Sequence, residues 1–304
     1  MTEVIDSKNV KWAEYVDEST LGTTPTNPTM VAFPGDLVEF VTGGGADFEE
    51  YPVLKGATDT DPLSAGDATK TSETHSMKVT LKPQDMSLIP YALLGTTTTT
   101  YAPGKVPHYQ SIGMRVDDQY SVFKGGILSN FEFDIPDMKN AATLTLDYMG
   151  VERSDWSGTS YIGTGSHGTA PTSAPFTMGS LSSILYDGAA PSTANILIDS
   201  IKFSIKNNIE PVEDAASALA SKIAGWSFGQ REIGLELGVT MMDVGVQDDI
   251  FDGSAHTFAF TLDAKTYTFS NIFWVNAPDT NMSPADRVGM SLQSSGVATR
   301  LAIA

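Results

Sequence analysis

The sequence has no cysteine and few basic residues. Its 304 residues include 18 lysines and arginines against 37 aspartates and glutamates, a formal net charge of −19. The absence of cysteine excludes a disulfide framework, a thiolate zinc site and a cysteine nucleophile. So few cations exclude tight nucleic-acid binding through phosphate neutralisation, because that affinity is built from lysine and arginine contacts. Acidity of this kind suits solubility or a salt-adapted host.

Long apolar runs are also missing. The chain begins without the basic start and apolar stretch of a secretory leader, and no segment approaches the length of a bilayer-spanning helix. We therefore expect a soluble protein made in the cytoplasm. Glycine, proline, serine and threonine are abundant. That composition favours short strands and many turns, so the expected fold class is mainly β.

Apolar and polar residues alternate along two stretches of residues 123–150, before and after the loop PDMKNA. A period of two is typical of strands with one buried face, and the short loop between the stretches predicts an antiparallel hairpin. The apolar positions are Ile127, Phe131, Phe133 and Ile135 in the first stretch and Leu144, Leu146 and Tyr148 in the second.

A second pair of alternating stretches follows in residues 196–241, separated by an alanine-rich insert. Its apolar positions are Ile201, Phe203 and Ile205 in the first stretch and Ile233, Leu235, Leu237, Val239 and Met241 in the second. Two strands around a polar or small-residue insert therefore occur in each half of the chain, which suggests an internal duplication of pattern.

Composition divides the chain into four parts. We predict an extended N-terminal arm at residues 1–29 and a first β domain at residues 30–155. A linker rich in Gly, Ser, Thr and Pro follows at residues 156–185, and a second β domain is expected at residues 186–304. The spacing of apolar residues in QDMSLIPYALLG predicts a helix that Pro90 keeps short or kinked. We expect two tandem β-sandwich or β-barrel domains with short flanking helices.

Two motifs match enzyme patterns by letter. Residues 163–168 read G-x-G-x-x-G, but TAPTSAPF follows and cannot form the helix that a dinucleotide site needs, so we interpret them as linker. Residues 225–229 read G-x-S-x-G around Ser227, and the order of a serine hydrolase is completed by Asp243, Asp248 or Asp249, and then His256. The sequence after Ser227 has the pattern of a strand where that fold needs a helix. A glycine-rich turn is therefore the better interpretation.

Metal-binding patterns are equally weak. The four histidines lack H-E-x-x-H or i, i+4 spacing, and they are His75, His108, His167 and His256. A run of Asp248, Asp249, Asp252 and Gly253 lacks the spacing of a calcium loop and indicates a turn or an acidic helix start. We expect no metal, no cofactor and no enzymatic activity.

Two acidic residues of the second half, Glu232 and Glu236, lie on the same face of a predicted strand. Four residues of strand separate them by roughly 13 Å, too far for a glycosidase pair. We interpret them as part of a solvated or inter-subunit surface.

Three segments together resemble the major tail tube proteins of long-tailed bacteriophages and related archaeal viruses. They are SETHSMKVTLKPQDMSLIPYALLGTTTT, GGILSNFEFDIPDMKNAATLTLDYMG, and IDSIKFSIKNNIEP followed by GQREIGLELGVTMMD. The resemblance spans about residues 30–275 and rests on the order and spacing of these segments. The linker at residues 158–176 and the acidic bias have no match in the family.

The resemblance implies a structural virion protein of the tail. Tail-tube-like domains assemble into rings whose inward sheets close a barrel, and the rings stack into a tube that conducts double-stranded DNA to the host without tight binding. Partners would be further copies, three per pseudo-sixfold ring or six per ring, and other tail proteins at the tube ends. The residues expected to serve as core or ring-closing contacts are Phe131, Phe133, Leu144, Leu146, Ile201, Phe203, Leu235 and Leu237.

Two alternatives stay open. A secreted or carbohydrate-binding β-sandwich module would need exposed aromatic residues on one surface, and Trp156, Trp226 and Trp274 are scattered along the sequence. A serine hydrolase using Ser227 is the second alternative.

Overall fold

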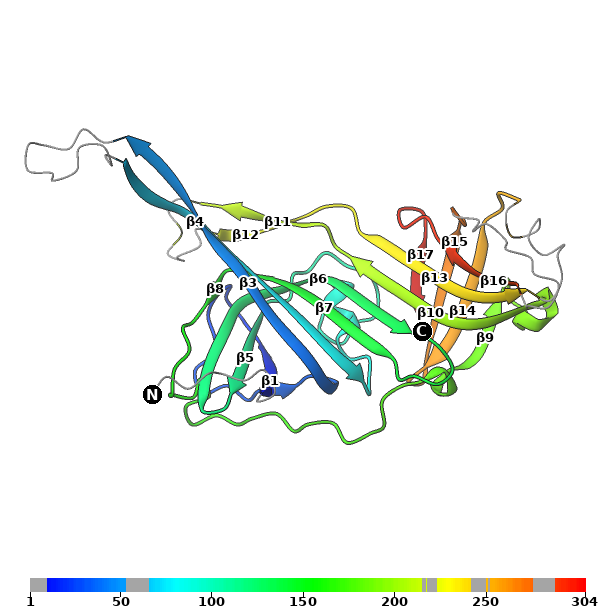
Figure 1. Cartoon of the computed structure of the whole chain (residues 1–304), viewed down its shortest axis with the longest axis horizontal. Coiled ribbons are helices and arrows are strands. Elements are labelled where there is room, and N and C mark those ends of the chain that lie inside the picture. Colours follow the sequence, from blue (N-terminus) through cyan, green and yellow to red (C-terminus); the bar gives the residue numbers. More distant parts are fainter. Residues whose placement is uncertain are drawn as a thin grey trace, which may run out of the picture.

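The computed structural model describes residues 10–52, 66–214, 217, 223–241, 250, 252–275 and 288–304. It is 55% strand and 5% helical, which confirms the predicted mainly β class (Figure 1). The alanine-rich insert and the acidic segment around Asp248 lie largely outside the described residues.

A central antiparallel sheet runs through the whole molecule. Its strand order is β3-β4-β7-β6-β10-β13-β16. The strands are β3 (Gly35–Pro52), β4 (Gly66–Pro83), β7 (Thr143–Gly150), β6 (Gln119–Ile135), β10 (Ile196–Lys206), β13 (Glu232–Met241) and β16 (Val288–Gln293). Strands from both halves of the chain therefore belong to one sheet.

A first outer sheet branches from the long strand β6. Its other strands are β5 (Gln110–Val116), β1 (Val10–Asp17), β2 (Val31–Ala32) and β8 (Glu152–Arg153). The first half of β6 pairs with β5, and the second half pairs with β7 and β10. The change of sheet falls at Gly125, whose φ of 62° is a conformation that glycine adopts without strain.

A second outer sheet covers the other half of the central sheet, in the order β17-β15-β14-β9. Its strands are β9 (Ser182–Tyr186), β14 (His256–Leu262), β15 (Lys265–Ile272) and β17 (Arg300–Ile303). A separate hairpin joins β11 (Ile209–Glu213) to β12 (Ile223–Phe228). The short helices are α1 (Ile89–Ala92), which has Pro90 in its first turn, and the 3₁₀ turns η2 (Met178–Ser180) and η3 (Pro191–Ala194).

One hydrophobic core fills the space between the central sheet and both outer sheets. All eight hairpin residues selected from the sequence are buried in it. Phe203 lies at its centre, with ring centroids 5.4 Å from Phe133 and 5.5 Å from Phe269 of the second outer sheet. These eight side chains are core residues of a single chain and are not accessible to a second copy.

Replacing Phe203 tests this description of the core. We expect Phe203→Ala to lower the free energy of unfolding by about 3–5 kcal/mol, because it removes buried aromatic area and leaves a cavity. Denaturant unfolding checks the value. Phe228→Ala, a half-buried residue outside the main core, should cost much less, and equal losses from both variants would contradict a core centred on Phe203.

The two predicted domains are joined by a pair of hydrogen-bonded strands, one from each domain. β6 and β10 pair directly, with Phe133 opposite Phe203. Buried Asn207, just after β10, donates to the carbonyl oxygens of Ala92 (2.8 Å) and Leu128 (3.2 Å) and accepts from Arg231 Nε (2.9 Å). The two halves thus share a sheet, a core and a buried polar network, while the division into tandem domains stays a prediction.

The predicted N-terminal arm is folded into the body where the structure describes it. Residues 10–17 form β1, which pairs with β5 along its length. Fully buried Glu14 accepts hydrogen bonds from Tyr161 Oη (2.8 Å) and the Gly168 amide (2.9 Å), and it contacts His167 Nδ1 at 2.7 Å. The polar character of this segment favoured an arm, but the Glu14 carboxylate holds the predicted linker against β1.

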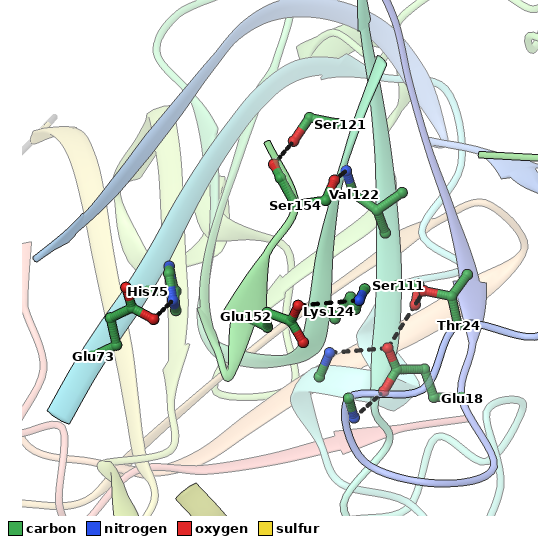
Figure 2. Close-up of polar contacts among 12 residues, drawn as sticks. Glu18, Thr24, Glu73, His75, Ser111, Ser121, Val122, Lys124, Glu152 and Ser154 are labelled. Atoms are coloured by element: carbon green, nitrogen blue, oxygen red, sulfur yellow. Dashed lines mark hydrogen bonds and ion pairs between the residues drawn. The ribbon is translucent and has the colours of Figure 1, made fainter. Parts of the chain in front are cut away.

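A second buried carboxylate, Glu18, fixes the end of β1 (Figure 2). It accepts hydrogen bonds from Ser111 Oγ (2.6 Å) and from the amides of Gly22 (2.7 Å) and Gly125 (2.9 Å). Gly125 is the point at which β6 changes sheets. Glu18 therefore stabilises both the turn after β1 and the corner of the fold.

Removing this carboxylate is expected to be costly. Glu18→Ala leaves two buried amides, those of Gly22 and Gly125, without an acceptor, while Ser111 can still donate to Thr24. We expect a loss of about 3 kcal/mol in the free energy of unfolding. Thermal and denaturant melts measure it. The exposed Asp118→Ala is the control, and it should change stability by less than about 0.5 kcal/mol. A Glu18→Ala protein as stable as the control would contradict the anchoring role.

Candidate functional site

The face of the central sheet opposite the core is polar across five neighbouring strands, β4 to β13. Because side chains alternate along a strand, neighbouring residues on this face form rows across the sheet. One row reads Lys78, Asp147, Asn130, Lys206 and Glu232 from β4 to β13, and another reads Lys82, Thr143, Asp134, Lys202 and Glu236. We call this surface the polar sheet face.

Each lysine of the polar sheet face has a carboxylate directly opposite on a neighbouring strand. The pairs are Lys78 with Asp147, Lys82 with Asp36, Lys202 with both Asp134 and Glu236, and Lys206 with Glu232. Lys202 Nζ also lies 3.0 Å from Glu132 Oε1 on the diagonal. This contact of Lys202 is an ion pair, whereas Lys82 Nζ donates to Thr143 Oγ1 (2.8 Å) and to the carbonyl oxygen of Ala141 (3.3 Å). Opposite charges in register across neighbouring strands favour the sheet.

Protonation on this face follows from its local contacts. The hydrogen bond to Glu132 raises the pKa of Lys202, so this lysine stays charged throughout the physiological range. Partial burial raises the pKa of Asp134, and neighbouring Lys202 opposes that rise. The polar sheet face therefore presents positive charges, negative charges and hydrogen-bonding groups close to one another.

A shallow groove of about 600 Å³ lies at one end of the polar sheet face. Its lining includes Asp147, Lys206 and Glu232, and residues just beyond β10 close it. Nearby, small serine and glycine residues lie opposite each other on neighbouring strands, so few side chains project from the sheet. A Cβ at Gly234 would lie 2.6 Å from Ser204 Oγ, and one at Gly238 would lie 2.3 Å from Ser200 Oγ. The face is therefore smooth where β10 meets β13.

The two outermost strands of the central sheet have open edges. Within the described residues, β3 bonds only to β4, and β16 bonds to β13, with residues 274–275 touching its C-terminal end. Exposed valines gather at both edges: Val38 (57% exposed) and Val41 on β3, and Val275 and Val297 (57% exposed) beside β16. Unpaired strand edges flanked by apolar side chains are ready to pair with another chain.

The hydrolase residues are not brought together. Ser227 lies on the hairpin strand β12, and its Oγ contacts the carbonyl oxygen of Glu210 at 3.5 Å. His256 lies on β14 in the second outer sheet, apart from the β11–β12 hairpin (Figure 1). Its ring nitrogens contact Asp187 Oδ2 (2.8 Å) and the carbonyl oxygen of Ile250 (3.1 Å). Asp243, Asp248 and Asp249 lie outside the described residues.

The remaining motif residues have structural contacts. The glycine pattern at residues 163–168 forms a loop against residues 27–32, where a Cβ at Gly165 would lie 2.1 Å from the carbonyl oxygen of Pro28. Asp252 accepts from the amide and hydroxyl of Ser254. Glu232 and Glu236 lie on the polar sheet face, as their spacing indicated. No group of three metal-ligating side chains occurs in the described part of the chain.

Histidines and tryptophans likewise contact their own chain. His108 Nε2 lies 2.8 Å from the carbonyl oxygen of Gly95, and His75 lies 3.6 Å from Glu73 (Figure 2). Trp226 is buried, Trp156 packs against the core, and Trp274 donates to Tyr186 Oη at 3.1 Å. These tryptophans do not form the exposed aromatic platform of a carbohydrate-binding module.

Sequence reasoning identified the strands but missed the lysine–carboxylate pairing. The signal was present as Lys202 and Lys206 on one predicted strand and Glu232 and Glu236 on another, but pairing needs the register. No protein-family model matches the chain, and no curated protein matches it in sequence. Among the described residues, no helix combines the length and apolar character needed to cross a bilayer.

Proposed function

We propose that this chain is a structural subunit of a viral tail tube, which self-assembles into stacked rings and conducts double-stranded DNA. The observation that carries the proposal is a single sheet, spanning both halves of the chain, with a core on one face and a charge-paired polar surface on the other. Such a sheet can form a wall of a water-filled bore while its other face stays buried.

The open edges supply the means of ring closure. β3 of one copy would pair with β16 of the next, a head-to-tail contact that uses different surfaces on each copy and closes when the rotation permits. Valines at both edges would add buried apolar area to the backbone hydrogen bonds. Because both halves contribute three or more strands to the central sheet, three chains per pseudo-sixfold ring are favoured.

The polar sheet face suits a surface along which DNA slides. Phosphate binding requires lysines free to replace counterions. Here each lysine lies opposite a carboxylate in the strand register, and Lys202 is held in an ion pair with Glu132, so a phosphate approaching any of these lysines would also meet a negative charge. In the expected bore, each positive charge would therefore lie next to a negative charge. Weak DNA binding would follow from this local arrangement and not only from an overall excess of acidic residues.

The long hairpin of β3 and β4 supports stacking between rings. It projects beyond the rest of the fold on one side of the molecule (Figure 1). Eighteen residues in each strand make it far longer than its pairing with β7, which ends at His75. A projecting hairpin of this length can reach a neighbouring ring.

Electron microscopy with light scattering tests the proposal. The purified chain at high concentration is expected to form hollow rings or tubes with threefold or sixfold symmetry. A particle that stays monomeric at all protein and salt concentrations would contradict the proposal, because a tube subunit must self-associate.

A further inference from the structure

A cleft of about 480 Å³ opens beside the first half of β6, away from the polar sheet face. Its walls are residues 24–27, the start of β6, and the loop of residues 154–163. Figure 2 shows one wall of it, where Ser121 Oγ donates to the carbonyl oxygen of Ser154 and the Val122 amide donates to Ser154 Oγ. The volume lies within the range of small-ligand sites.

Serine hydroxyls in this cleft are held in place with a hydrogen left to donate. The oxygens of Ser154, Ser157 and Ser160 accept from the amides of Val122 (2.8 Å), Thr159 (3.1 Å) and Ile162 (3.4 Å). A hydroxyl that accepts from an amide can still donate its own hydrogen. The cleft therefore presents several fixed donors toward a ligand that carries many acceptors.

Two tyrosine rings also line the cleft. Tyr120 and Tyr161 meet edge to face, with ring centroids 5.9 Å apart. Tyr161 is fixed by its hydrogen bond to Glu14 and lies over Gly113, where a Cβ would be 2.3 Å from Cζ. Arg115 lies 5.4 Å from the Tyr120 ring. Both rings are ordered before any ligand arrives, which lowers the entropy cost of binding.

The charges of the cleft disfavour an anionic ligand. Among the described residues that line it, Lys124 is the cation, and its Nζ lies 3.3 Å from Glu152. Asp155 contributes an exposed carboxylate to the lining. Phosphate, sulfate or carboxylate groups would meet a neutralised lysine and a like charge. A neutral ligand rich in hydroxyls would instead find donors and an acceptor for them.

We propose that this cleft binds a neutral saccharide of one or two rings. Asp155 accepts hydrogen bonds from adjacent sugar hydroxyls, the serines donate to sugar oxygens, and Tyr120 packs against the C–H face of the ring. The site is independent of the tube assembly, because it uses neither the polar sheet face nor the open edges.

Binding is tested with an array of neutral and of sialylated or sulfated glycans. Saturation-transfer NMR with glucose, galactose, mannose and N-acetylglucosamine follows on the same protein. We expect saturable binding of at least one neutral probe, weakened at least tenfold by Asp155→Ala and by Tyr120→Ala. Glu213→Ala, an exposed acid on β11, should bind as the unaltered protein does.

Asp155→Ala is the decisive variant, because Asp155 is exposed and its removal is not expected to disturb the fold. Circular dichroism melts establish that both variants remain folded. Absence of binding to every neutral probe at millimolar concentration would overturn the proposal. So would binding confined to anionic glycans, or binding that both variants retain in full. None of these results bears on ring formation.

Discussion

A variant whose acids on the polar sheet face are neutralised should bind DNA. The substitutions are Glu132→Gln, Asp147→Asn, Glu232→Gln and Glu236→Gln. They remove the ion-pair partner of Lys202 and the negative charges opposite Lys78 and Lys206, and three lysines without a neighbouring acid would give a salt dependence of about third order in the binding constant. We expect an affinity gain of about 100-fold at low salt, measured by fluorescence anisotropy with a short duplex.

The fold should survive these changes, because each amide keeps an oxygen that can accept. Asn208 and Ser291 donate to Glu232 and Glu236, and Asn130 donates to Asp147. A control raises the net charge equally at exposed acids elsewhere, with Asp118→Asn, Glu210→Gln, Glu213→Gln and Asp263→Asn. The control should leave DNA binding undetectable. Equal affinity of the two variants would show that overall charge, and not this face, decides the interaction.

Lysine at an open sheet edge should prevent assembly. Natural edge strands use charged side chains to block pairing with other chains. Val38→Lys with Val41→Lys on β3, or Val297→Lys beside β16, would place charges in the contact between copies. We expect the protein concentration needed for assembly to rise at least about 100-fold, the equivalent of roughly 2.7 kcal/mol.

Monomer stability separates this effect from misfolding. The valines are about half exposed, so the free energy of unfolding should change by less than about 0.5 kcal/mol. Met138→Lys is the matched control, since Met138 is 66% exposed in the β6–β7 loop, away from both edges. Light scattering across a dilution series measures assembly. Assembly that tolerates the edge lysines as well as it tolerates Met138→Lys would rule out the edges as the contact.

Alternation along the strands predicted much of the fold. The hairpin of β6 and β7 and the strands β10 and β13 lie where their apolar periods indicated, and their inward residues form the core. Pro90 limited the predicted helix to the four residues of α1. The local pattern is enough to predict these elements because each has one solvent-facing and one buried face.

Long-range contacts could not be predicted in the same way. Glu14 and Glu18 gave residues 10–29 a polar character. In the structure both carboxylates are buried, and they accept hydrogen bonds from residues far away in the sequence. The glycine-rich segment before β9, residues 156–177, packs along the first half because Tyr161 and Phe176 make specific contacts there. The pairing of lysines with acids depends on register between strands far apart in sequence, which composition does not encode.

Cryo-electron microscopy of the assembled protein tests the central claim most directly. The account predicts rings in which β3 of each copy pairs with β16 of the next and the polar sheet face lines a continuous bore, with Lys78, Lys202 and Lys206 turned toward it. An assembly that buries the polar sheet face between copies, or turns it outward, would contradict a DNA conduit even if the particles were hollow.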